Sequence, residues 1–132
     1  MVEAAYLSGK LIITGEIEEK YLIDLYKKAK VSIRFGFKEK GPGMGSLESI
    51  AWGIPLIIND GIGIKEVVKN NVNGYIVEET DSPLIANLID GLFKRKDTWS
   101  EISQNNLVLA KELSWDEHCF KLNNLFRDIL NK

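Results

Sequence analysis

The sequence is poor in cysteine and histidine, with Cys119 and His118 the only examples among 132 residues. A lone cysteine excludes an internal disulfide framework and a cysteine-built metal site. A zinc site needs several nitrogen or sulfur ligands, so no metal site is expected. A single histidine also disfavours a Ser–His triad, although one histidine would suffice for it. Both residues fall on a predicted helix, and we expect them to have structural roles.

The chain also lacks an apolar run of the roughly 18 residues that a membrane-spanning helix needs. Met1 is followed by Val2 and Glu3 rather than by a basic, apolar signal sequence, so we expect a cytoplasmic protein. The 17 lysines and arginines nearly balance the 19 aspartates and glutamates, and no basic face for nucleic acid is indicated. Hydrophobic residues make up 45%, and the length suits a single domain over 1–132.

Short apolar runs alternate with amphipathic segments along the chain. We expect buried strands at residues 11–14, 31–35, 54–58 and 75–77. Two helices are expected at residues 18–29 and 64–69, and a third begins at a cap formed by Ser46, with Leu47, Ile50 and Ala51 facing inward. A fourth helix is expected to begin at Asp81-Ser82-Pro83. Two more are expected to begin at the capping-box pairs Thr98/Glu101 and Ser114/Glu117. This order predicts an α/β fold, with a parallel sheet of about four strands, right-handed crossovers and a helical C-terminal tail.

Two of the expected helices carry apolar stripes for a core. The stripe of the helix after Asp81 comprises Leu84, Ile85, Leu88, Ile89, Leu92 and Phe93, and that of the last helix comprises Leu122, Leu125, Phe126 and Ile129. Both stripes need a surface to cover them.

A glycine-rich loop, residues 36–45, joins the expected strand 31–35 to the next helix. Ligands of open parallel sheets bind beyond the carboxyl ends of the strands. Glycines let the backbone approach a ligand, and a helix start offers free amides with partial positive charge. We therefore expect a phosphate platform made by the amides of Gly43, Met44, Gly45 and Ser46.

Charged residues flank this loop. Glu48 is expected in the first turn of the following helix, where it can accept hydrogen bonds from sugar hydroxyls, while Lys38 and Lys40 add positive charge beside the loop. The alternative is a tight strand-to-helix connection, with Glu48 a first-turn acid favoured by the helix dipole. The loop matches neither the P-loop pattern nor the complete dinucleotide fingerprint.

Five segments, in order and at the right intervals, resemble the C-terminal half of a GT-B-fold, family 4-type (group 1) retaining glycosyltransferase. They are YLIDLYKKA at 21–29, GMGSLE at 43–48, AWGIP at 51–55, GIGIKEVV at 61–68 and VNGYIV at 72–77. The resemblance runs from about residue 9 to 130. It implies a Rossmann-like domain, a partial GT-B C-terminal domain, that binds a nucleotide-sugar donor without a metal or other cofactor.

The family's donor motif has two glutamates separated by seven residues. The second contacts the nucleotide ribose, and Glu48 fits it, while the amides after Gly43 would take the diphosphate. The first approaches the donor hexose, but the residue eight before Glu48 is Lys40, with Glu39 one position earlier. A one-residue insertion would bring Glu39 into this catalytic role; otherwise the role is lost.

The resemblance finds no counterpart here for the family's acceptor-binding N-terminal domain, nor for the first two strands and helices of its C-terminal domain. We therefore expect the donor-binding part of a hexosyltransferase that is inactive as an isolated chain. A non-catalytic nucleotide-binding or assembly module is the alternative, and a signalling or scaffold domain with accidental similarity is a third. A nucleotide sugar is the expected ligand, and self-association or a second chain would cover the incomplete sheet.

Overall fold

A three-stranded parallel sheet organises the fold of the computed structural model, which describes residues 11–78 and 81–131. The strands are β1 (Ser32–Arg34), β2 (Leu56–Ile58) and β3 (Gly74–Ile76), in the order β1-β2-β3. Ile33 pairs with Ile57, which pairs with Tyr75 on the other side. The α/β class, the parallel sheet and three of the four expected strands are confirmed.

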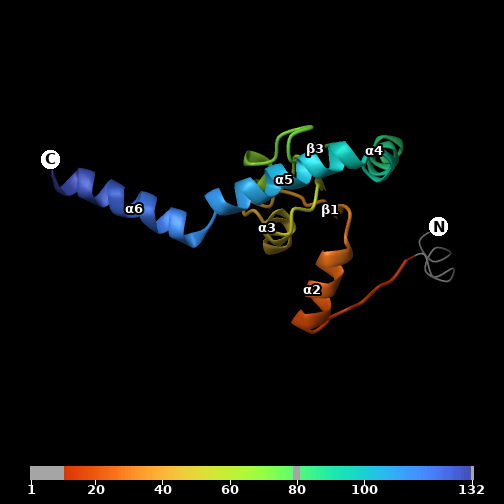
Figure 1. Ribbon diagram of the computed structural model, residues 1–132, viewed down its shortest axis with the longest axis horizontal. Helices are drawn as coiled ribbons and strands as arrows, with labels where there is room; N and C mark the ends of the chain where they lie inside the picture. Colours follow the sequence, from red (N-terminus) through yellow and green to blue (C-terminus); the bar gives the residue numbers. More distant parts are fainter. Residues whose placement is uncertain (1–10, 79–80, 132) are drawn as a thin grey trace.

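Helices precede, connect and follow these strands (Figure 1). They are α2 (Glu19–Lys28), α3 (Met44–Ala51), the short 3-10 helix η1 (Gly63–Glu66), α4 (Ser82–Lys94), α5 (Lys96–Glu112) and α6 (Trp115–Leu130). The Asp81 side chain caps α4 by accepting from the amide of Leu84 at 3.0 Å. Ser114 caps α6 by accepting from the amide of Glu117, as its capping-box spacing predicts.

The expected first strand is wrong. Residues 11–14 form no strand, and the side chains of Ile12 and Ile13 are 79% and 69% exposed. A β-branched run becomes a strand only where a neighbouring strand satisfies its backbone groups, and no described strand pairs with these residues. The sheet therefore has three described strands, with one edge of β1 unpaired by them.

Two expected helix starts are also wrong. The helix α3 begins at Met44, because Gly43 takes a φ of 69° and serves as its N-cap in place of Ser46. The helix α5 begins at Lys96, which puts Thr98 inside its first turn rather than at the cap. In each case the chain enters the helix earlier than the capping side chain suggests.

The core lies on both faces of β2, as expected for a central parallel strand. Leu56 and Ile58 belong to a cluster with Ile50, Ile62, Ile64 and Val68, whereas Ile57 joins Tyr75, Val77, Leu92 and Ile102 on the opposite face. Three residues expected to face inward, Ala51, Leu84 and Phe93, are instead exposed. Ala51 lies on the outer side of α3, and the other two lie beyond the strip of α4 that meets the sheet.

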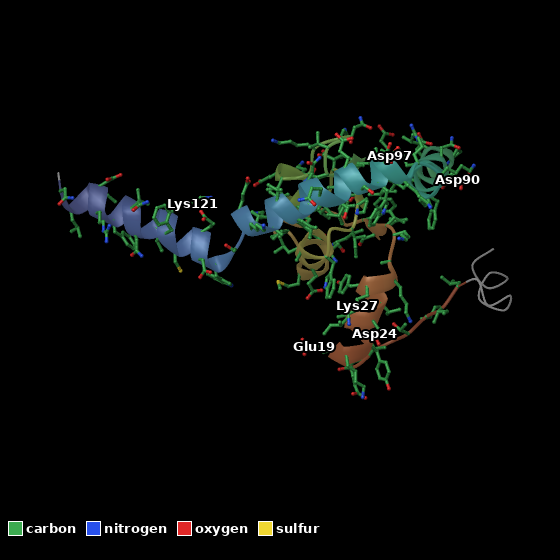
Figure 2. The ribbon with its side chains drawn as sticks, viewed as in Figure 1. Glu19, Asp24, Lys27, Asp90, Asp97 and Lys121 are labelled. Carbon is green, nitrogen blue, oxygen red and sulfur yellow. The ribbon has the colours of Figure 1, made fainter. Side chains whose placement is uncertain are left out.

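The helix α6 extends away from the body of the fold (Figure 1), and its side chains, Lys121 among them, stand clear of the sheet (Figure 2). Its apolar stripe of Leu122, Leu125, Phe126 and Ile129 is exposed in consequence. His118 and Cys119 lie on this helix, as expected. None of the helices described in residues 11–78 and 81–131 is long and apolar enough to cross a membrane.

Candidate functional site

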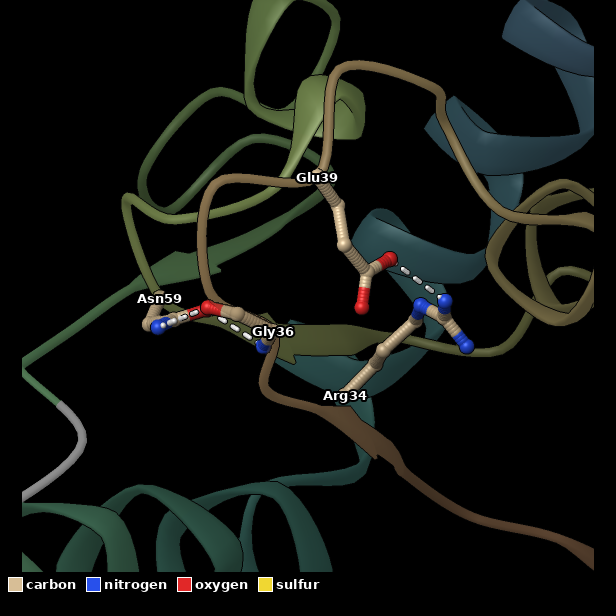
Figure 3. A network of polar contacts seen from close by, with 4 residues as sticks. All are labelled: Arg34, Gly36, Glu39 and Asn59. Atoms are coloured by element: carbon tan, nitrogen blue, oxygen red, sulfur yellow. Dashed lines mark hydrogen bonds and ion pairs between the residues drawn. The ribbon is translucent and has the colours of Figure 1, made fainter.

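The loops that follow β1 and β2 are locked together at the carboxyl edge of the sheet. The buried Asn59 side chain accepts from the amide of Gly36 at 3.0 Å and donates to the Gly36 carbonyl at 2.8 Å (Figure 3). The Glu39 amide donates to the Gly61 carbonyl at 2.9 Å. Only glycine fits at Gly61, because a Cβ there would collide with the carbonyl oxygen of Gly36. The first half of loop 36–45 is therefore held at several points.

An ion pair joins the end of β1 to this loop. Arg34, at the end of β1, donates from Nη2 to Oε2 of Glu39 at 2.7 Å (Figure 3). The two side chains are 36% and 40% exposed. The same guanidinium lies against Gly43, where a Cβ would come within 2.8 Å of Cζ, Nε and Nη2. Arg34 thus joins Glu39 to the start of α3, a link that the sequence analysis did not assign.

The first turn of α3 leaves backbone donors free. No side chain caps the helix, and the amides of Met44 and Gly45 donate to nothing in the described chain. The Ser46 amide donates to the Gly43 carbonyl at 3.1 Å. Ser46 is 1% exposed, and its hydroxyl has no hydrogen-bond partner among the described residues. This end of α3 is consequently rich in unused donors, as an anion site at a helix start would be.

Glu48 lies on the second turn of α3 and is oriented by a residue of α2. The Tyr26 hydroxyl donates to Oε2 of Glu48 at 2.7 Å. Burial, this hydrogen bond and the nearby carboxylate together raise the pKa of Tyr26 to about 12. Since α3 begins at Met44, no acidic residue stands in its first turn. The expected place of Glu48 in the first turn is therefore wrong, and with it the alternative that the helix dipole stabilises this acid, because that effect fades beyond one turn.

A groove of about 980 Å³ opens beside Glu39 and Lys40. Its walls come from residues 37–40, residues 59–63, Lys65, Glu66, Val77 and Glu78. Lys65 pairs with Asp60 at 2.7 Å, so part of its charge is already balanced. The groove collects Lys38, Glu39 and Lys40, whereas residues 43–48 lie outside its lining. No cluster of three or more His, Cys, Asp or Glu side chains suited to a metal ion occurs in the described ranges.

The chain belongs to the glycosyl transferases group 1 family, whose model matches residues 1–107. Sucrose-phosphate synthase 4 of Arabidopsis thaliana is 31% identical over 77 residues, which are 58% of this chain and 7% of that protein. The chain therefore spans a small part of the length of such relatives.

Solved structures share the fold. A sucrose-phosphate synthase from Thermosynechococcus elongatus superposes with a TM-score of 0.74 at 21% identity, over 98% of this chain and 33% of that one. The C-terminal domain of a group 1 glycosyl transferase from Francisella tularensis gives a TM-score of 0.69 at 21% identity, over 83% and 57%. Anabaena HepE in complex with UDP-glucose gives 0.60 at 20% identity, over 67% and 24%. The Rossmann-like, GT-B-type fold is confirmed.

Proposed function

We propose that this chain binds a nucleotide-sugar donor and serves as the donor part of a hexosyltransferase. The proposal rests on the start of α3, where Gly43 at a positive φ leaves the amides of Met44 and Gly45 free. In a member of the glycosyl transferases group 1 family, such a helix start suits the diphosphate of a nucleotide sugar. The complex of the structurally similar HepE with UDP-glucose supports this choice of ligand.

Glu48 is proposed to hold the ribose of the nucleotide. Its Oε2 is engaged by Tyr26, and its Oε1 accepts no hydrogen bond from the described chain, which leaves it for a ribose hydroxyl. Tyr26 therefore acts as a positioning residue for Glu48. A carboxylate fixed in this way makes stronger hydrogen bonds than a neutral acceptor.

Calorimetric titration with UDP tests this assignment. Replacement Glu48→Gln keeps an oxygen that can accept from Tyr26 but removes the charge. We expect it to weaken UDP binding by about 1.5–3 kcal/mol, the contribution of a hydrogen bond to a charged group. Glu101→Gln, an exposed change of the same kind on α5, is the matched control. Unchanged UDP affinity in a folded Glu48→Gln variant would contradict the assignment.

Glu39, rather than Lys40, is proposed for the first glutamate of the donor motif. Its carboxylate points to Arg34, which also touches Gly43, so Glu39 lies beside the proposed diphosphate platform. If Glu39 contacts the hexose, Glu39→Gln should lower affinity for UDP-glucose more than for UDP. Lys40→Gln, one residue away in the same exposed loop, should change both affinities alike.

The second candidate is a non-catalytic nucleotide-binding or assembly module. It is favoured by Lys40, which stands eight residues before Glu48 in place of an acid. Under this alternative, Glu39→Gln would leave the ratio of the UDP-glucose and UDP affinities unchanged. We further propose that these 132 residues do not transfer sugar alone and act together with an acceptor-binding part.

A further inference from the structure

Arg34 has more hydrogen-bond donors than the described chain uses. Its guanidinium donates from Nη2 to Glu39, and no other acceptor within residues 11–78 and 81–131 meets it. In the described part of the chain, Nε is enclosed without a partner and Nη1 makes no hydrogen bond either. Because enclosed donors normally find acceptors, an arginine left this way points to a missing anionic partner.

The unused donors of Arg34 lie at the same place as those of α3. The guanidinium packs against Gly43, directly before the free amides of Met44 and Gly45. Ser46, which is 1% exposed, adds a hydroxyl without a partner, and side chains of a helix tilt toward its N-terminus. A guanidinium and two unused amides therefore meet at one end of an eight-residue helix, whose third residue is Ser46.

We propose that Arg34 binds the diphosphate of the nucleotide-sugar donor through the guanidinium nitrogens that its ion pair with Glu39 leaves unused. The planar guanidinium suits phosphate oxygens, which it can bind through two parallel hydrogen bonds. The Glu39 carboxylate, seated on Arg34 at 2.7 Å, shows that this corner of the site accommodates negative charge. The inference rests on the proposed function, because it names the residue that offsets the charge of the same donor.

A purely structural ion pair is the competing explanation. Both partners are more than a third exposed, and pairs of this kind contribute little to stability. A structural pair would make Arg34 and Glu39 equivalent, since losing either partner breaks the same contact. If a diphosphate binds here, the two substitutions have opposite effects on its affinity. Losing Arg34 removes an attraction for the phosphates, whereas losing Glu39 removes an anion that competes with them for Arg34.

Calorimetry on the full 132-residue chain separates these cases, with UDP and uridine as probes. We expect Arg34→Gln to weaken UDP binding at least tenfold and to leave uridine binding unchanged, because uridine has no phosphates. Glu39→Gln should bind UDP as tightly as the unaltered chain or more tightly. The double variant Arg34→Gln/Glu39→Gln should match Arg34→Gln, and Arg34→Lys, which keeps the charge, should lose less than Arg34→Gln.

The outcomes are distinguishable. If the unaltered chain binds no UDP, the proposed function fails and this inference with it. If the chain binds UDP and folded Arg34→Gln does so equally well, or loses uridine to the same extent, Arg34 has no diphosphate role while donor binding stands. If Arg34→Gln does not fold, Glu39→Gln decides: a loss of UDP affinity in that variant would overturn the inference.

Discussion

Tyr26 of α2 donates a hydrogen bond of 2.7 Å to Glu48 of α3, joining two helices that are 22 residues apart at these positions. The ring of Tyr26 also lies nearly parallel to that of Trp52, with centroids 6.4 Å apart. The orientation of Glu48 is therefore set by α2, which has no buried residue of its own. The candidate ribose acceptor depends on a helix that otherwise packs loosely.

Replacement Tyr26→Phe should destabilise the fold modestly. It removes the hydrogen bond to Glu48 but keeps the ring against Trp52. We expect the free energy of unfolding to fall by about 1 kcal/mol, a typical value for one hydrogen bond. Denaturant unfolding measures this, with Tyr21→Phe as the control, because Tyr21 is exposed and its hydroxyl makes no hydrogen bond in the described chain. Equal losses in both variants would contradict the prediction.

The Tyr26 phenol should lose its proton at a higher pH than an ordinary tyrosine. Its folded pKa of about 12 lies above the ordinary value of 10, because of burial and then the Glu48 carboxylate. A raised pKa means that the contribution of Tyr26 to stability is complete below pH 10 and is lost as pH rises to about 12. The tyrosinate absorbance of the unaltered chain minus that of Tyr26→Phe should show this late transition. A difference curve with its midpoint near 10 would argue against the pairing with Glu48.

Much of the fold could be predicted from local patterns. The strands expected at 31–35, 54–58 and 75–77 alternate with apolar helical stripes, and each overlaps a described strand. Residues 11–14 have the same composition but no neighbouring strand, and composition does not reveal whether a partner exists. The start of α3 was misplaced because a glycine at positive φ caps it, and glycine carries no side chain to signal that role.

The candidate site could be predicted only where its residues are adjacent in the sequence. Residues 43–48 form one segment, so their helix and glycines could be read directly. Tyr26 and Arg34 belong to the site through contacts with Glu48 and Gly43, which depend on how α2 and β1 pack against α3. Arg34 ends an apolar strand, and a charged residue at the carboxyl end of a parallel strand is the one sequence signal that could have pointed to it.

A side chain at Gly43 should destabilise the fold, in contrast to one at Gly41. Gly43→Ala combines a positive φ with a Cβ 2.8 Å from the Arg34 guanidinium, so we expect a loss of about 1–3 kcal/mol in unfolding free energy. A Cβ on Gly41 meets nothing within 4 Å, and Gly41→Ala should stay within about 0.5 kcal/mol. Thermal or denaturant unfolding compares the two, and similar stabilities would show that the loop rearranges freely.

The isolated 132-residue chain should bind a nucleotide sugar without transferring its hexose. The chain covers 33% of the sucrose-phosphate synthase structure that it resembles, and transfer requires an acceptor positioned against the reacting carbon of the donor. Incubation with UDP-glucose and simple sugar acceptors should release no UDP above background in a coupled assay. An intact group 1 transferase serves as the positive control. Multiple turnovers by the purified chain would refute this expectation.

Apolar surface on α6 and beside β1 should make the chain associate, with itself or with another chain. Phe126, Leu125 and Ile129 lie on one face of α6 with about half of each side chain exposed, and Ile33 of the edge strand β1 is 45% exposed. Monomers rarely expose such contiguous patches, because burying them yields roughly 25 cal/mol per Å² before association costs.

We expect sedimentation at micromolar concentration to give a mass above one chain. Phe126→Asp should lower that mass, because it places a charge within the α6 stripe of Leu122, Leu125, Phe126 and Ile129. Asn123→Asp adds the same charge to an exposed polar position on the same helix and should leave the mass unchanged. If Phe126→Asp fails to lower the mass, association proceeds through the edge of β1 that no described strand pairs, where backbone groups offer a second surface. A strict monomer at high concentration would show that neither surface drives assembly.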